Sequence, residues 1–574
     1  MTRYLVVAHE TVTNPELLKQ VRAVREQEGE AEFGQPEAGR CARHGPRLGT
    51  RRLVVTTWAG RGAWHRLWPR SPHAGARQPV TTDSRHPMAQ SAESGTRSRP
   101  QPELKRVMGP GLLLLFIVGD ILGTGVYALT GNIAGEIGGA AWAPILVAFL
   151  VATITAFSYL ELVTKYPGAS GAALYTHKAF GIHFITFLVT FAVLSSGLTS
   201  ASTAASAVAS NFARGFGLEV DTTTITVIAV IFIAILAAIN IRGVTEGLAF
   251  NVVLTSIELT GLLIVILVGF WAAFQGQADF SQTMVFETSE DKGIFLALTA
   301  VTSLAFFSFV GFEDSVNMVE ETKNPSRDFP RVMLFGLGLT GVVYILVSIF
   351  TVAVVPIGVL GESTTPLLDM VRIGAPNIPI DTIYPFLTIF AVANTALINM
   401  LMASRLLYGM ARQGVLPDFL GHVLQGRRTP WSAIVFTSLL AMALIVVINN
   451  ILGSGTASAL GGTTALLLLG VFTIVNVAAI ILRKDHSPTH DYFHAPRVLP
   501  YLGAITCAYL VGPWAQDLVE YQIAVVLLLI GLGLWIVNFV YDRLFLGRKV
   551  RFEHPEALAR MEDEPADQDP HRGP

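Results

Sequence analysis

The feature that most constrains this chain is a series of long apolar runs that begins at Leu112 and continues to residue 543. Only 14% of the residues are charged, whereas about a quarter of an average soluble protein is charged. About 20 apolar residues span a bilayer as a helix, which also satisfies its own backbone polar groups there. We therefore predict an all-α polytopic membrane protein with about twelve transmembrane helices. The predicted helices lie near residues 109–131, 140–163, 179–212, 222–240, 248–274, 293–319, 332–355, 381–410, 431–449, 460–482, 499–515 and 519–543.

Positive charges are unevenly distributed between the two predicted sides of the membrane. If the N-terminus is cytoplasmic, the opposite side carries only Arg214, Lys292 and Arg372, and every other Lys and Arg of residues 101–551 lies on the cytoplasmic side. Cytoplasmic loops carry an excess of Lys and Arg. The pattern predicts a multi-pass protein of the cell inner (plasma) membrane with both termini in the cytoplasm.

Residues 1–100 are a different kind of sequence. They begin like a small α/β domain, but nothing after Phe33 continues it, and the stretch that follows is rich in Arg, Gly, Pro, His and Trp. It is either a basic tail that touches anionic lipid headgroups or an over-extended reading frame with Met88 as the true start. We predict a membrane domain at 101–546 and a disordered, acidic cytoplasmic tail at 547–574.

The first predicted helix, LLLLFIVGDILGTGVYALTG, contains Gly123, Thr124 and Gly125 near its middle. A break there frees backbone N–H and C=O groups, which something other than lipid must satisfy. The N-terminal end of a half-helix attracts a carboxylate. The alternative is that these glycines only allow neighbouring helices to approach closely.

The sixth predicted helix is interrupted in a similar way. Ser308–Phe312 contains Gly311 and is followed by Glu313 and Asp314. Two carboxylates inside a span are costly, so they should face a cavity or a partner. The two interruptions are five helices apart, as expected of two inverted five-helix repeats with a binding site at their interface.

Three segments resemble the permeases of the amino acid–polyamine–organocation (APC) superfamily. ILGTGVYALTG resembles their first-helix motif, FFSFVGFED with EETKNPSRDFPR their sixth helix and its cytoplasmic exit, and ASRLLYGMARQGVLP the end of their eighth helix. The resemblance covers residues 103–546 and is greatest to bacterial relatives of the cationic amino acid transporters. It implies a LeuT-like 5+5 inverted repeat with broken helices 1 and 6.

The resemblance also implies a function. It indicates a secondary active transporter, not an enzyme, which moves amino acids across the plasma membrane by alternating access, coupled to protons or by exchange. A polyamine or amine transporter of the same fold is the alternative, and a membrane sensor or receptor is a third reading. The implied partners are an amino acid or amine substrate, the lipid bilayer and a proton.

Site residues can be carried over by position. Gly123–Gly125 matches the unwound segment whose backbone amides hold the substrate carboxylate. Phe307, Ser308 and Gly311 fall where the sixth helix offers carbonyls to the substrate ammonium group. Four aromatic residues are candidates for the gate over the substrate, and at least two of them should only pack or face lipid: Phe306, Phe307, Phe309 and Phe312.

Two carboxylates depart from the family pattern. Asp120 stands one helical turn before the break, at a position that is often small in the family. Glu258 stands where several relatives carry a Lys in place of a coupling sodium ion, and it could carry a proton instead. We predict that Asp120 or Glu258 is the proton-coupling or amine-recognising group. The alternative is a buried carboxyl that is hydrogen-bonded to a neighbouring helix.

Charged residues surround Asn324-Pro325 at the exit of the sixth helix. We expect them to form ion pairs that close the cytoplasmic side, with Lys165 or Arg405 as partner; the alternative is a solvated loop. These cytoplasmic gate candidates are Glu320, Glu321, Lys323, Arg327 and Arg331.

Other kinds of chemistry find no support in the sequence. Cys41 and Cys507 are too few and too far apart for a disulfide framework or a metal site. No GxxxxGK[ST] loop is present for ATP, and the His residues lie mostly in tails and loops. We therefore expect no cofactor, no metal, no catalytic triad and no nucleic-acid partner.

Overall fold

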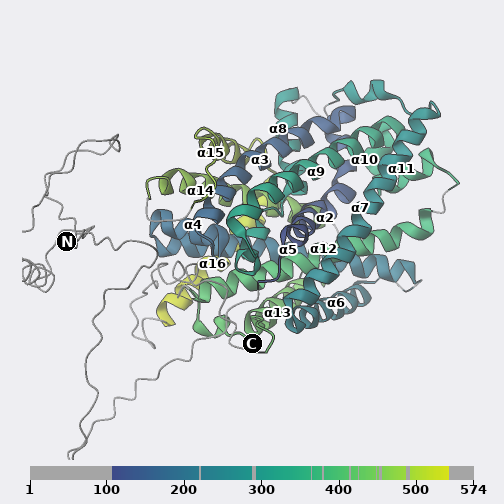
Figure 1. Ribbon diagram of the computed structural model, residues 1–574. Coiled ribbons are helices and arrows are strands. Elements are labelled where there is room, and N and C mark those ends of the chain that lie inside the picture. Colours follow the sequence, from purple (N-terminus) through teal and green to yellow (C-terminus); the bar gives the residue numbers. More distant parts are fainter. Residues whose placement is uncertain are drawn as a thin grey trace, which may run out of the picture. The chain divides into compact units, whose positions relative to one another are not determined.

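The computed structural model describes the chain from residue 106 to residue 541, and Figure 1 shows its arrangement. Within that range it leaves out 217, 219–220, 288–292, 364, 378–379, 413–414, 425, 448, 451–455 and 486–490. The predictions for residues 1–100 and 547–574 lie outside the described residues.

The described part of the chain is helical, and its only β-type pairing is an isolated bridge between Met108 and Thr322. Ten helical segments are long and apolar enough to cross a membrane, and Trp431–Val447 and Leu499–Leu510 are shorter apolar helices. This confirms the predicted all-α polytopic membrane protein. The count of twelve spans and the inverted repeat stay predictions. The α-helices are α2 (Pro110–Ile137), α3 (Trp142–Lys165), α4 (Gly171–Phe180), α5 (His183–Gly215), α6 (Thr222–Arg242), α7 (Val244–Phe274), α8 (Ile294–Phe306), α9 (Pro325–Val354), α10 (Ile357–Glu362), α11 (Pro366–Gly374), α12 (Ile380–Arg412), α13 (Trp431–Val447), α14 (Thr456–Leu482), α15 (Leu499–Leu510) and α16 (Leu518–Tyr541).

The predicted run 179–212 straddles the boundary between two helices. Helix α4 ends at Phe180, and Gly181 caps it with a left-handed φ of 65°, its N–H donating to the carbonyl of His177. A glycine adopts this conformation without a steric penalty, which is why it commonly follows a helix end. The long membrane helix α5 then starts at His183.

Helix α9 begins earlier than predicted. Pro325 occupies its first turn, where the missing N–H is not needed. Pro330 lies inside the helix, where its missing N–H leaves the carbonyl of Ser326 without a helical partner. The helix therefore runs from Pro325 rather than from the predicted residue 332.

Helix α2 is central to the bundle. It packs against α7, α8, α9 and α12, and α5 lies alongside α12. In Figure 1 it runs through the interior of the bundle, with α9 on one side and α12 on the other. The first break is therefore surrounded by other helices rather than by lipid.

Candidate functional site

The first break lies at Gly123, whose φ of 13° and ψ of −162° interrupt α2. The hydroxyl of Tyr344, on α9, donates to the carbonyls of Ile121 and Leu122 at 2.5 and 2.7 Å. In an unbroken helix these two carbonyls would accept from the N–H groups of Gly125 and Val126. The proton of the Tyr344 hydroxyl is shared between these two carbonyls, so a side chain of α9 compensates the backbone at the break. The side chain of Thr124 lies outside the described part.

The second break separates α8 from a short 3-10 helix, η4 (Asp314–Glu321). Between them lie the 3-10 turn η3 (Phe307–Phe309), an extended Val310 and Gly311, whose φ is 130°. The N–H of Gly311 donates to Oε2 of Glu313 at 2.8 Å. This bond fixes Glu313 relative to the break.

Glycines let the two breaks touch. A Cβ atom at Gly311 would lie 2.9 Å from the carbonyl carbon of Asp120 and 3.0 Å from its Cγ, and one at Gly125 would lie 2.8 Å from Cα of Ser308. Contacts under 3.0 Å to backbone atoms would force the helices apart. The predicted site residues Gly123–Gly125, Ser308 and Gly311 are therefore brought together, with Ser308 packed against Gly125 rather than on the cavity wall.

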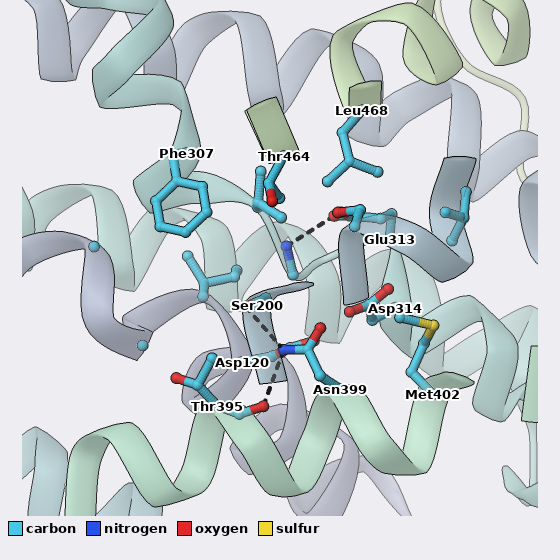
Figure 2. Close-up of a pocket in the computed structure, with 17 residues that line it drawn as sticks. Asp120, Ser200, Phe307, Glu313, Asp314, Thr395, Asn399, Met402, Thr464 and Leu468 are labelled. Carbon is cyan, nitrogen blue, oxygen red and sulfur yellow. Dashed lines mark hydrogen bonds between the residues drawn. The ribbon is translucent and has the colours of Figure 1, made fainter. Parts of the chain in front are cut away.

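A cavity lies where the breaks meet (Figure 2). Its volume is about 30 Å³, which holds two or three water molecules at roughly 10–15 Å³ each. It is too small for an amino acid in this conformation. Its lining comes from α2, the second break, α5, α12 and α14: Asp120, Ile121, Gly123, Gly125, Val193, Ser196, Ser200, Phe307, Val310, Gly311, Glu313, Asp314, Thr395, Asn399, Met402, Thr464 and Leu468.

Three carboxyl groups line this cavity, and none of its described lining residues is Lys, Arg or His. Asp120, Glu313 and Asp314 are each at most 5% exposed. Oδ2 of Asp120 and Oε1 of Glu313 have no hydrogen-bond partner among the described residues. Buried carboxyls require a donor or a positive charge to compensate them. The cavity therefore favours a ligand with cationic or hydrogen-bond-donating groups.

The opposite wall is polar but uncharged. Asn399 donates from Nδ2 to the carbonyl of Thr395 at 2.9 Å and to Oγ of Ser200 at 3.5 Å, as Figure 2 shows. Oγ1 of Thr395 has no partner in the described part of the protein. Our sequence reasoning missed this wall. The available signal was the spacing of Thr395, Asn399 and Met402, which places them on one face of a helix.

The structure separates the four gate candidates. Phe307 lines the cavity. The side chains of Phe306, Phe309 and Phe312 are fully buried in the core. Phe309 packs between Phe149 and Tyr344, at ring distances of 5.8 and 5.3 Å. These three act as packing residues in this conformation and leave Phe307 as the aromatic beside the site.

Asp120 and Glu258, the two carboxylates that differ from the family pattern, lie in different surroundings. Asp120 lines the cavity. Glu258, on α7, does not; Nδ2 of Asn394 donates to its Oε2 at 3.4 Å, and its Oε1 has no partner among the described residues. The same Asn394 amide donates to the carbonyl of Gly119 at 3.1 Å. The side chain of Glu258 is therefore linked to the broken helix through Asn394, and its backbone carbonyl accepts from the hydroxyl of Tyr127, on α2, at 3.4 Å.

At the end of the bundle where α2 begins, Glu321 and Arg405 form a buried ion pair. Nη2 and Nε of Arg405 lie 3.2 and 3.3 Å from Oε1 of Glu321, and both side chains are at most 1% exposed. Glu320 accepts from the N–H of Ala169 at 3.1 Å.

The other gate candidates lie outside this pair. Lys323, in the turn between η4 and α9, and Arg327, in the first turn of α9, are exposed and form no ion pair within the described residues. Lys165 caps α14 instead, donating to the carbonyls of Leu482 and Asp485, each at 2.7 Å.

Comparison with known proteins places this arrangement in context. The model of a protein family described as "Amino acid permease" matches residues 112–515. The chain is 26% identical over 440 residues to the methylthioribose transporter of Bacillus subtilis, covering 73% of this chain and 89% of that protein. It is 24% identical over 477 residues to the branched-chain amino acid permease BcaP of Bacillus subtilis, with coverage of 79% and 95%. It is 26% identical over 351 residues to cationic amino acid transporter 9, chloroplastic, of Arabidopsis thaliana, with coverage of 58% and 60%.

Proposed function

The chain belongs to the amino acid permease family, and from this premise we propose that it transports an amino acid with a positively charged side chain by alternating access. One observation supports a positively charged substrate side chain: Asp120, Glu313 and Asp314 line the cavity, and none of the described lining residues is basic. The relatives differ in the substrates in their names, which include methylthioribose, branched-chain amino acids and cationic amino acids. Charge complementarity at the site favours the last of these.

The proposed binding mode uses both breaks. The substrate carboxylate meets the amides of Gly125 and Val126, whose helical acceptors are bonded to Tyr344. The two positive groups of the substrate meet Asp120 and Asp314, since Glu313 already accepts from Gly311. Phe307 then covers the occupied site.

The small volume of the cavity requires the helices to separate before a substrate enters. The second break and α2 form one wall, and α5 and α12 form the other. If the two walls separate at the end of the bundle where α2 begins, Arg405 on α12 must move away from Glu321 on η4. We therefore propose this pair as the cytoplasmic gate. The distribution of Lys and Arg supports a plasma-membrane protein with both termini on this cytoplasmic side.

Replacement of Asp120 by asparagine tests the assignment of the cavity. Loss of one charge-assisted contact should weaken the apparent affinity for a basic amino acid about tenfold or more, measured as uptake competition in proteoliposomes. Asp279→Asn removes an exposed carboxylate outside the cavity and should leave affinity unchanged. Branched-chain amino acids competing better than basic ones in the unmodified protein would contradict the proposed substrate class.

A diamine or polyamine is the second candidate, because three carboxyls can pair with several ammonium groups. The discriminating feature is the substrate carboxylate, which only the amides at the first break would recognise. Competition by ornithine and by putrescine separates the two, since putrescine lacks that carboxylate. If putrescine competes more strongly than ornithine, the substrate is an amine rather than an amino acid.

We further propose that Glu258 carries the coupling proton. It is 1% exposed, has one oxygen without a partner among the described residues, and shares Asn394 with the broken helix. A proton gained or lost there would alter the contact that holds Gly119.

Glu258→Gln should abolish accumulation driven by a pH gradient and leave substrate exchange at zero gradient within about twofold. Glutamine keeps the shape and the bond with Asn394 but cannot release a proton in this pH range. Proteoliposomes with and without an imposed gradient provide the measurement. Unchanged gradient-driven accumulation would show that coupling resides elsewhere.

A further inference from the structure

A second cavity opens where α2 and α9 begin. Its volume is about 320 Å³, much larger than that of the substrate cavity. Neither break contributes to it, and the proposed transport mechanism makes no use of it. Its lining residues are Pro110, Asn324, Arg327, Asp328, Arg331 and Val332.

This cavity lies at the level where the membrane begins. The apolar spans Pro110–Tyr127 and Pro325–Val354 both start beside it. The segments that lead into them are tied together by the bridge between Met108 and Thr322 and by the bond from the N–H of Lys323 to the carbonyl of Met108, at 2.9 Å. The two helix starts therefore lie side by side. Because an apolar span begins at each of them, we infer that they lie at the depth of the lipid headgroups.

The positive charges of this cavity have no protein partner in the described residues. Arg327 and Arg331 are exposed and four residues apart, so they lie on one face of α9. Neither forms an ion pair within the described residues. Two guanidinium groups on one face match a phosphodiester, which they can bind through parallel N–H bonds.

The one carboxylate of the lining adds a second requirement. Asp328 is 8% exposed, and its Oδ2 has no hydrogen-bond partner among the described residues. A buried acceptor without a donor is costly. A ligand that carries a phosphate and also a hydroxyl group would satisfy both the arginines and Asp328.

We propose that this cavity binds the headgroup of an anionic phospholipid of the phosphatidylglycerol type. The phosphodiester lies between Arg327 and Arg331, and a glycerol hydroxyl donates to Asp328. The exposed Arg106 and Lys323 beside the cavity add to the attraction for an anionic membrane surface. The acyl chains continue along the apolar starts of α2 and α9. This assignment is independent of the substrate.

The test uses the purified full-length protein in detergent and a short-chain phosphatidylglycerol. Native mass spectrometry measures the bound lipid, and gel filtration verifies that each variant is folded. The double variant Arg327→Ala/Arg331→Ala should bind at least about tenfold more weakly, since each basic residue near an anionic lipid contributes about 1 kcal/mol. The matched control Arg242→Ala/Arg427→Ala removes two exposed arginines elsewhere and should bind like the unmodified protein.

Further binding measurements identify the ligand. Asp328→Asn should reduce the preference for phosphatidylglycerol over phosphatidic acid, which lacks the glycerol hydroxyls. Glycerol phosphate should not compete at equal concentration; full competition would identify a site for a soluble phosphate and overturn the lipid assignment. Equal lipid binding by the double variant and its control would also overturn it. If the double variant does not fold, Arg331→Gln alone should still weaken binding severalfold, and unchanged binding would overturn the assignment.

Discussion

Replacing Arg405 by alanine should remove about 3–5 kcal/mol from the free energy of unfolding, because it leaves Glu321 buried without its counter-charge. Both side chains of the pair are at most 1% exposed, and Oε2 of Glu321 already has no partner among the described residues. Arg405 also donates from Nη1 to Oγ of Ser404 at 2.9 Å. Thermal unfolding in detergent measures the loss. A shift in melting temperature no larger than that of Arg427→Ala, an exposed arginine, would contradict the role of the pair.

Stability and gating can be separated by replacing both partners. Glu321→Leu with Arg405→Met removes both charges at similar volume, and such replacements of buried ion pairs are often neutral or stabilising. Opening would expose both side chains to water, which favours charged groups and disfavours apolar ones. The double variant should therefore be stable and transport at least about tenfold more slowly in proteoliposomes. Transport by the double variant at the rate of the unmodified protein would show that this ion pair is not part of the gate.

Gly311→Ala should reduce transport by roughly tenfold to a hundredfold. The φ of 130° is one that residues with a side chain rarely adopt, and such strain costs about 1–3 kcal/mol. The new Cβ would also lie 2.9 Å from the carbonyl carbon of Asp120, so the two breaks would have to part. Both effects displace a carboxylate that the proposed substrate requires.

A matched glycine provides the control for this substitution. Gly338 lies within α9, and a Cβ added there has no neighbour within 4 Å. Gly338→Ala should leave transport unchanged and stabilise the helix slightly, by up to about 1 kcal/mol. Equal transport by the two alanine variants would show that close contact between the breaks is not needed.

The sequence was sufficient for the helices because apolar character along about 20 residues is a local property. Each predicted run contains a long helical segment, although 179–212 begins in the last turn of α4 and 293–319 divides into α8, η3 and η4. It was also sufficient for both interruptions, since Gly123 and Gly311 stand out in apolar segments. Glu313 and Asp314 were expected to face a cavity or a partner, and both line the cavity.

The composition of the site could not be read in the same way. Ser200 is one of several Ser and Thr residues of α5. The spacing of Thr395 and Asn399 places them on one face of α12, but it does not show which helix that face meets. These three residues reach the cavity because α5 and α12 pack beside α2. Phe306 and Phe307 are adjacent in the chain, yet one is in the core and the other lines the cavity.

The sequence by itself therefore determined a helical membrane protein, the location of its two breaks and the presence of uncompensated carboxylates within its spans. Only the tertiary structure decided that Asp120 lines the cavity while Glu258 pairs with Asn394, and that Arg405 rather than Lys165 meets Glu321. The reason is physical. Transfer into a membrane depends on the composition of one segment, whereas a contact depends on the rotation and depth of two segments at once.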